Sequence, residues 1–345
     1  MSTSDLILAT RELFVRSLKD EVAMATPVWE ELQQRNQVTY SGGPSIKRLV
    51  DTDTMEDLVQ EYSANDALTD EKKTTLQKPE FTWKLAQMPL RYDVDEYLQN
   101  ITAGKEEQLL DLAQFLTTKG QQAVKRKMDQ VIWNSGSATP ILAASKSFES
   151  IISALNHDTA YGTLSRSFSA GTNDWWQGAD PAGLGEVVAS SSQDTATNLT
   201  ISNLRKWINE SSIAHHMLTP ADLNVYMCPT LFNKLRAEME SKLIYKEPTG
   251  DGSVDQKLLK MKLDKHTIVS VPYLQTSSTM KTWVVIMNMA DWELRIHTER
   301  NFKMTDFKWQ GDQSNGYDYW LARILWSGNL VCWKPNGSMW LSAVS

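Results

Sequence analysis

Hydroxyl side chains that could act as nucleophiles gather between residues 161 and 181, a segment rich in serine, glycine and threonine. Ser165, Ser167 and Ser169 lie close to Arg166 there. A catalytic serine needs an adjacent base, and in many hydrolases it stands on a glycine-framed turn. The segment has neither feature, so we expect no catalytic residue in it.

Candidates for metal or acid–base chemistry are equally sparse. His215 and His216 are neighbours on an expected helix and point about 100° apart, so they do not chelate one ion easily. Cys228 and Cys332 lack metal or redox spacing and lie in apolar surroundings, which indicates buried free thiols. Phosphate-binding glycine motifs and zinc-protease motifs are missing. The sequence therefore predicts no enzyme, no cofactor and no metal site.

Carboxylates crowd into residues 51–71, where no Lys or Arg occurs. Paired carboxylates can bind Ca²⁺ or act as acid and base, but this stretch lacks the glycine and the distal glutamate of a calcium loop. We interpret it as a solvated or partner-facing acidic surface. The members that we single out are Asp51, Asp53, Glu56, Asp57 and Glu61.

Aromatic side chains are the more promising functional groups. Trp175 and Trp176 stand side by side in the turn-rich segment, and adjacent aromatics in a loop are typical of packed contacts between elements or between chains. The chain has 13 tryptophans, which are scattered over its whole length. We favour a core and subunit contacts rich in aromatics; a sugar-binding platform is the alternative.

The composition is that of a globular protein. The chain has 345 residues, 41% of them apolar and 22% charged, with a formal net charge of −7. The longest basic run is Lys125 to Lys127, so tight intrinsic DNA binding is not expected. The N-terminal residues lack a long apolar core and no window approaches eighteen apolar residues, so we expect neither a signal peptide nor a membrane partner.

The elements that position these groups begin with an amphipathic helix over residues 3–35, interrupted at Pro27. Alternating apolar residues predict a strand over residues 81–95, and Pro89 in its middle predicts an edge strand or a bulge. With a short strand at residues 46–50, it frames the acidic stretch as a long hairpin. An isolated hairpin is marginally stable, so we expect this one to lie on a neighbouring subunit.

A long helix is predicted over residues 102–134, with Gly120 as a bend point. At about 1.5 Å per residue it spans roughly 45 Å. Its basic triplet, Lys125, Arg126 and Lys127, has two interpretations: a solvated helix end, or a patch that pairs with a neighbour's acidic hairpin. Both stay open.

The C-terminal half alternates helices and strands. Helices are predicted over residues 199–218 and 230–243, and buried strands over 267–271 and 283–287. A long aromatic-rich strand follows over residues 317–333, broken at Ser327-Gly328. The pattern as a whole indicates a mixed α+β fold.

Two short motifs carry a resemblance to a known family. Residues 40–44 (YSGGP) and residues 161–166 (YGTLSR), the latter followed by Trp175-Trp176, resemble segments of tailed-bacteriophage major capsid proteins, which have the Hong Kong 97-like shell fold. The order of elements is similar over essentially the whole chain. The resemblance implies an N-terminal arm (1–36), an extended E-loop (37–97), a peripheral domain with a spine helix (98–198 and 300–345) and an axial α/β domain (199–299).

The resemblance further implies a protein that self-assembles, as pentamers and hexamers, into an icosahedral shell around double-stranded DNA. It implies a place in the virion, assembly in the host bacterial cytoplasm, a separate scaffolding protein, a portal, and minor or decoration proteins. The alternatives are a Trp-rich carbohydrate-binding or hydrolytic domain, and another phage structural protein of the tail or connector. The side chains expected at subunit contacts are Phe14, Trp29, Tyr40, Asp51, Asp53, Glu56, Asp57, Glu61, Trp83, Lys125, Arg126, Lys127, Arg166, Trp175 and Trp176.

Overall fold

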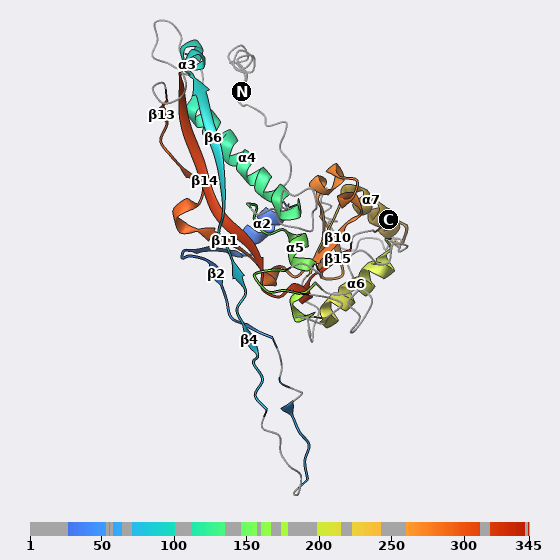
Figure 1. The fold of residues 1–345 in the computed structure, drawn as a ribbon. Coiled ribbons are helices and arrows are strands. Elements are labelled where there is room, and N and C mark those ends of the chain that lie inside the picture. The colour runs from blue at the N-terminus through green and yellow to red at the C-terminus, as the bar shows by residue number, and fades with distance from the viewer. Residues whose placement is uncertain are drawn as a thin grey trace, which may run out of the picture.

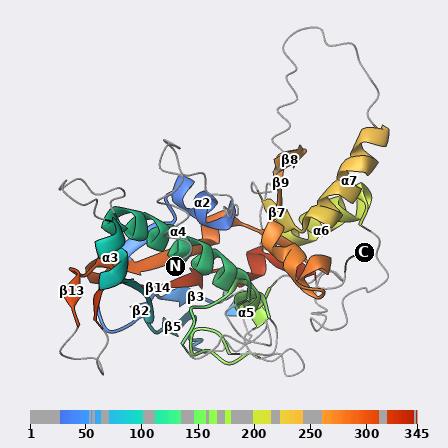
Figure 2. The same cartoon turned by 90° about the horizontal axis from the view of Figure 1, so that it is seen from above.

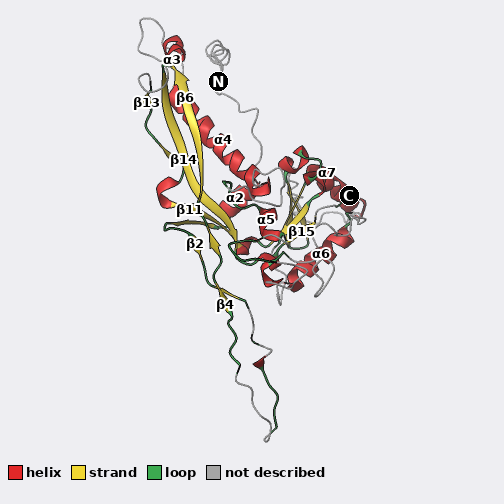
Figure 3. Ribbon diagram, viewed as in Figure 1, coloured by secondary structure: helices red, strands yellow, loops and turns green. Residues whose placement is uncertain are grey.

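Two β-sheets, one elongated and one compact, organise the computed structural model of the chain (Figures 1 and 3). Helices flank both sheets, and a long hairpin projects from the lower end of the elongated sheet in Figure 1. The structure describes residues 27–52, 55, 58–63, 71–100, 112–134, 146–156, 160–166, 174–178, 199–214, 223–242, 260–310, 318–341 and 344.

The elongated sheet is built around one long strand, β14 (Tyr319–Cys332). On one edge β14 pairs antiparallel with β6 (Lys84–Asp93) over residues 319–328. Its other edge pairs antiparallel with three shorter strands, which are β13 (Lys308–Trp309), β12 (Lys303–Met304) and β11 (Trp292–His297). Strand β11 in turn pairs in parallel with β1 (Val38–Ser41).

The predicted break in this long strand at Ser327-Gly328 is wrong, because β14 runs through both residues. Gly328 serves close approach instead. A Cβ there would lie 2.6 Å from the carbonyl oxygen of Arg295 on β11 and 2.6 Å from the ring of Trp326. Glycine therefore lets the neighbouring strand and the indole pack directly against the backbone of β14.

β6 is an edge strand, as Pro89 predicts, because its only described pairing is with β14. The alternation of apolar residues from Phe81 onwards predicts that Leu85 is buried, and this is wrong: Leu85 is 62% exposed, whereas Leu90 is buried. Phe81 and Leu85 belong to separate strands, β5 and β6, so the alternation of buried and exposed side chains starts anew in β6.

Helix α4 (Leu112–Asn134) lies along one face of the elongated sheet and contacts β6 and β14. Val124, Met128 and Val131 are buried there, in agreement with the predicted apolar stripe. Gly120 is buried, and a Cβ at this position would meet Leu90 at 2.7 Å and Ile324 at 2.8 Å. Its role in the structure is thus close packing of helix on sheet.

The compact sheet has the order β15-β10-β7-β9-β8, and in Figures 1 and 2 helices α6 and α7 lie beside it. β7 and β9 are parallel, and the other pairs are antiparallel. Thr200 caps α6 by accepting from the Asn203 N–H. The elements are β7 (Asn224–Met227), β8 (Lys260–Leu263), β9 (His266–Ser270), β10 (Val284–Met287), β15 (Met339–Leu341), α6 (Ile201–Ala214) and α7 (Pro229–Lys242).

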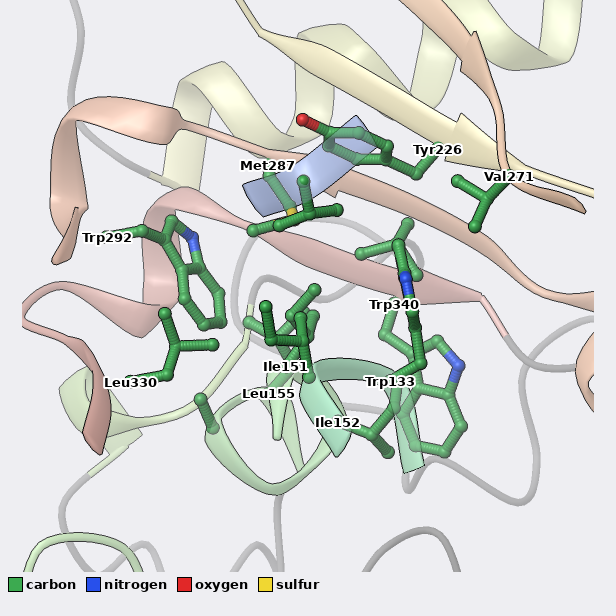
Figure 4. Packing of buried hydrophobic residues seen from close by; sticks show 14 of the residues in the cluster. Trp133, Ile151, Ile152, Leu155, Tyr226, Val271, Met287, Trp292, Leu330 and Trp340 are labelled. Carbon is green, nitrogen blue, oxygen red and sulfur yellow. The ribbon is translucent and has the colours of Figure 1, made fainter. Parts of the chain in front are cut away.

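One buried apolar cluster connects the two sheets. Figure 4 shows Trp133 of α4, residues of α5 (Ile151–Leu155) and Trp340 of β15 packed below Tyr226 of β7. The rings of Trp133 and Tyr226 meet edge to face, with centroids 5.8 Å apart. Helix α5 begins at Ile151, because Ser150 caps it in a capping box with Ser153.

The remaining described elements are short. Helix α2 contacts β11, and α3 follows β6 directly. Their bounds are α2 (Pro27–Gln34), α3 (Val94–Asn100), β2 (Ile46–Lys47), β3 (Val50–Asp51), β4 (Leu76–Gln77), β5 (Glu80–Phe81), η2 (Asp174–Trp176), η3 (Pro272–Thr276), η4 (Met280–Thr282), η5 (Met289–Asp291), η6 (Thr298–Arg300) and η7 (Pro335–Gly337).

Candidate functional site

The long hairpin, which comprises residues 46–81, is the feature of this structure that most needs a partner. Its two chains pair as β2 with β5 and as β3 with β4. Beyond β3 and β4 it extends far from both sheets (Figure 1). A two-stranded ribbon without a packed face is marginal in water. The expected hairpin is thus present.

Exposed apolar side chains follow the described part of the hairpin. Val59 is 78% exposed and Tyr62 is 66% exposed, and Leu49 and Leu76 are also exposed. Large apolar side chains gathered on one protruding element mark an interaction site more often than an ordinary surface. The hairpin therefore offers both carboxylates and apolar side chains to a partner.

The base of the hairpin is fixed to the sheets. The Trp83 indole N–H donates to the carbonyl oxygen of Gly43 at 2.8 Å, and its ring packs edge to face on His297. Lys47 and Glu80 form an ion pair at 2.8 Å, and Lys47 holds the pKa of Glu80 below its ordinary value. The predicted contact residue Trp83 thus orients the hairpin within its own chain.

Phe81 of β5 explains the YG motif that begins the turn-rich segment. Its ring packs edge to face on Tyr161 at 4.9 Å and on Trp333 at 5.9 Å. Gly162 has φ of +58°, and a Cβ there would lie 2.5 Å from the Phe81 ring. The hydroxyl of Tyr161 accepts from the Cys332 N–H at 2.8 Å. The motif therefore connects the base of the hairpin to the end of β14, by ring packing on Phe81 and by the hydrogen bond from the Cys332 N–H.

Arg166 organises the rest of that segment. Its guanidinium donates to the carbonyl oxygens of Ser153 at 2.5 Å and Ala154 at 2.6 Å, in the last turn of α5. It also donates to the carbonyl oxygen of Trp176 at 3.0 Å. A cation that satisfies the free carbonyls of a helix C-terminus is favourable. Arg166 thereby ties α5 to η2.

This placement corrects part of the predicted contact set. Trp29, Arg166 and Trp176 are buried inside the chain, so their side chains support the fold rather than a surface for another subunit. Trp176 donates from its indole N–H to the carbonyl oxygen of Tyr161 at 2.9 Å. Trp175 is half-buried and packs on Trp176. The described side chains of the turn-rich segment therefore make their main contacts within their own chain.

The other predicted contact residues lie at scattered places. Tyr40 on the edge strand β1 is exposed, as are Asp51 and Glu61 on the hairpin. On α4, Arg126 is half-buried and Lys127 is exposed. Four predicted positions, and the side chain of a fifth, lie outside the described residues: Phe14, Asp53, Glu56 and Asp57, and the side chain of Lys125.

The tryptophans are mostly core residues. All 13 lie in the described part of the chain, and only Trp309 is exposed, at 48%. Its indole N–H donates to the carboxylate of Asp318. A sugar-binding platform of tryptophans needs several exposed indole rings on one surface, and the described residues provide one exposed indole. The expectation of an aromatic-rich core is confirmed.

Catalytic and metal-binding constellations are not found in the described residues. No group of three or more His, Cys, Asp or Glu side chains there has the arrangement of a metal site. Cys228 and Cys332 are buried and free, as predicted, and burial raises the pKa of the Cys332 thiol well above its ordinary value. No helix in the described residues is long and apolar enough to cross a membrane.

Two carboxylates, buried Asp129 and half-buried Glu149, have raised pKa values. Desolvation raises the pKa of Asp129 on α4 to about 7 and raises the pKa of Glu149 before α5. Glu149 accepts from the Ser153 hydroxyl at 3.0 Å, and its backbone N–H donates to Asn329. Ser153 belongs to the capping box of α5, and Asp129 accepts from the backbone of Trp29, so we assign both carboxylates to the fold. Sequence patterns did not single out either residue, because their burial depends on packing between distant elements.

A hollow of about 610 Å³ lies at the edge of the elongated sheet beside β12. At about 30 Å³ per water, this volume corresponds to roughly 20 water molecules. No sequence motif marks it, because η6, β12, β13 and β14 all contribute. Its lining residues are Glu299, Arg300, Lys303, Met304, Thr305, Asp306, Lys308 and Leu325.

Comparison with known proteins gives a match in structure. No protein-family model and no curated protein sequence matches the chain. A chain of the cyanophage A-1(L) capsid matches with a TM-score of 0.65 at 13% identity over 96% of both chains. A chain of the native GTA particle capsid matches with a TM-score of 0.57 at 10% identity over 100% of both chains. The capsid of Myoviridae phage XM1 gives 0.52 at 12% over 95% of both.

These matches cover nearly the whole length of each chain. At identities of 10–13% they establish the fold and nothing finer. The chain thus has the mixed α+β fold of viral and virus-like capsid proteins, which is the fold that the sequence resemblance predicts.

Proposed function

We propose that this chain is the major capsid protein of a tailed bacteriophage and that many copies assemble, as pentamers and hexamers, into an icosahedral shell around double-stranded DNA. The observation that carries the proposal is the end-to-end structural match with capsid chains, over at least 95% of each partner in the three comparisons above. A match of that extent covers nearly the whole chain.

The physical state of the hairpin supports the same proposal. It presents exposed Val59 and Tyr62 on a ribbon that its own chain does not cover in Figure 1. Obligate interfaces between subunits commonly bury 2,000 Å² or more, and an extended arm supplies such area at a small cost in mass. We infer that the hairpin lies on a neighbouring subunit of the shell.

The proposed layout follows the four parts that the resemblance implies. Residues 1–36 form the arm, the long hairpin forms the tip of the E-loop, α4 is the spine helix and the compact sheet belongs to the axial domain. Strand pairing supports boundaries that differ from the expected ones. We assign β15 to the axial domain because it pairs in the compact sheet, and β1, β6 and β11 to the peripheral domain because they pair in the elongated sheet.

The net charge of −7 suits the inner wall of a container for DNA, because it limits adhesion to the packaged polyanion. The proposal includes a separate scaffolding protein, a portal and minor or decoration proteins as partners, with assembly in the host bacterial cytoplasm and a final place in the virion. It assigns no enzymatic activity to the chain.

Electron microscopy of the purified protein, with light scattering on the same sample, tests this function. Closed particles of uniform size, or free pentamers and hexamers, are the expected result. Open rings or tubes would favour a connector or tail protein. A monomer that binds glycans in a screen would favour the carbohydrate-binding alternative.

A truncated hairpin gives a sharper second test. Asp51 and Leu76 are paired across β3 and β4, so an Asn-Gly turn can replace residues 52–75 without disturbing the base. We expect a subunit with unchanged circular dichroism and thermal midpoint that forms no closed shells. Normal shells from this variant would contradict the role of the hairpin. Replacement of exposed Leu85 by Ser, outside the hairpin, is the matched control.

A further inference from the structure

We infer that the hollow beside β12 is the docking surface for the acidic hairpin of a second copy of this chain. The inference rests on the proposed function, because it requires copies of the chain to lie side by side in a shell. It adds to that function the surface on which the hairpin binds and the charged residues that favour this binding.

Unpaired cations surround the hollow. Arg300, Lys303 and Lys308 line it, and none of them forms an ion pair with another described residue. Arg323 borders it, since it lies two residues from the lining residue Leu325 on β14 and therefore shares its face. An excess of cations on one surface raises the local potential and favours an anionic partner.

Two anions also line the hollow, Glu299 and Asp306. The three lining cations less the two lining anions leave a formal charge of +1, in a chain whose total is −7. The positive charge is therefore local, and the mixed lining favours a partner with several carboxylates and some apolar area over a uniform polyanion.

The long hairpin has that chemistry. Between Arg48 and Lys72 the sequence contains no cation and eight carboxylates. Among its described residues, Glu61 stands between exposed Val59 and Tyr62. A strand that carries both carboxylates and apolar side chains is complementary to a hollow that is lined by cations and by the apolar side chains of Leu325 and Met304.

A hairpin from the same chain does not occupy the hollow. The hairpin projects from the lower end of the elongated sheet in Figure 1, whereas β13 lies along the upper part of that sheet and β12 pairs with Ile324 and Leu325 of β14. The only occupant that brings a hairpin of this composition is another copy.

The basic triplet of α4 fits less well. Arg126 is half-buried and already has an interaction within the chain. α4 also covers the opposite face of the sheet: Ile324 points toward Gly120 of α4, so Arg323 and Leu325 beside it point away from the helix. The structure therefore favours the hollow over the triplet as the hairpin's partner.

Charge reversal tests the inference. The hollow variant Lys303→Glu with Lys308→Glu, the hairpin variant Asp51→Lys with Glu61→Lys, and their combination are compared with the native chain by electron microscopy and light scattering. We expect each double variant to lower the yield of closed shells about tenfold or more, which corresponds to about 1.4 kcal/mol. The combination should restore part of the yield. Lys127→Glu, an exposed cation of α4, is the matched control and should leave the yield unchanged.

The outcomes separate the inference from the function. If the native chain forms no shells or capsomers even when its scaffolding protein is supplied, the proposed function fails. If the native chain assembles and the hollow variant assembles equally well, only the docking surface is wrong. Normal shells from the hollow variant that retain less DNA would assign the hollow to nucleic acid and would also overturn the inference.

A direct contact test does not depend on assembly yield. Val59→Cys on the hairpin and Thr305→Cys in the hollow are combined in one chain, whose two native thiols are buried. Mild oxidation of assembled particles should give disulfide-linked oligomers between copies. Val59→Cys with Lys127→Cys is the control and should give none. Equal cross-linking in both variants would count against the hollow.

Discussion

The backbone N–H of Trp29 donates a hydrogen bond to the carboxylate of Asp129, a residue one hundred positions along the chain. Trp29 is in the first turn of α2, where N–H groups lack partners within the helix, and Asp129 lies on α4. The contact therefore joins the helix that follows the N-terminal residues to the long helix on the elongated sheet. The carboxylate is 3% exposed, and its Oδ1 has no hydrogen-bond partner among the described residues.

Stability of the unassembled subunit should depend on pH through Asp129. Burial, and the negative charge of Glu30, raise the pKa of this carboxyl from 3.8 to about 7. The folded state then binds a proton more tightly than the unfolded state. The stabilisation from this proton is complete below about pH 4, declines as the pH rises and is lost above about pH 7, a change on the order of 2–4 kcal/mol.

Asp129→Asn removes this dependence, because the amide oxygen can still accept from Trp29 and no charge is buried. We expect the free energy of unfolding of the variant to change less between pH 5 and pH 8 than that of the native subunit, in guanidinium titrations. Asp306→Asn, at an exposed carboxylate, should leave the pH dependence as it is. An unchanged dependence in Asp129→Asn would show that other groups cause it.

Arg166→Ala should destabilise the subunit by about 3–5 kcal/mol, since three carbonyl oxygens lose a charged donor in the interior. Arg166→Lys should recover only part of this loss, because an ammonium lacks the planar fork that reaches several acceptors. Urea unfolding measures both. Arg205→Ala, which breaks the exposed ion pair with Asp264, is the control and should cost less than about 1 kcal/mol. Equal losses at Arg166 and Arg205 would contradict the central role of Arg166.

Gly328→Ala should lower stability by about 1–3 kcal/mol or more, because the added methyl group meets the fixed carbonyl of Arg295. Gly120→Ala should cost less. There the obstructing atoms are ends of side chains, and alanine gains about 1 kcal/mol in helix propensity over glycine. Gly42→Ala, with no atom closer than 3.9 Å, is the control. Thermal unfolding should rank the losses in that order, and a Gly120→Ala loss larger than that of Gly328→Ala would contradict the packing argument.

Tyr161→Phe removes the hydroxyl that accepts from the buried Cys332 N–H. We expect a loss of about 1–3 kcal/mol, because a buried donor is left unsatisfied while the ring contacts with Phe81 remain. Hydrogen exchange should become faster at the Cys332 amide in particular. Tyr40→Phe, at an exposed tyrosine on β1, should alter neither quantity. Unchanged exchange at Cys332 would mean that another group satisfies this amide.

Local patterns in the sequence were sufficient for much of the fold. Apolar spacing predicted helices over residues 102–134, 199–218 and 230–243, which contain α4, α6 and α7. Continuous apolar runs predicted buried strands over residues 267–271 and 283–287, where β9 and β10 lie. The thiols were expected to be buried. The positions of helices and strands and the burial of single side chains depend on neighbours within a few residues. The periods of helices and strands therefore reveal them in the sequence.

Tertiary structure alone decided how these elements use their side chains. Arg166 looked like a contact residue in a turn-rich loop, yet it is enclosed by α5 and η2. Gly328 looked like a break, yet it is the point where β11 approaches β14. Three further features depend on segments that are tens to hundreds of residues apart. They are the choice of which β6 side chains are buried, the pairing of β15 in the compact sheet, and the hollow beside β12. No local period records those pairings, because long-range contacts are set by the packing of complete elements.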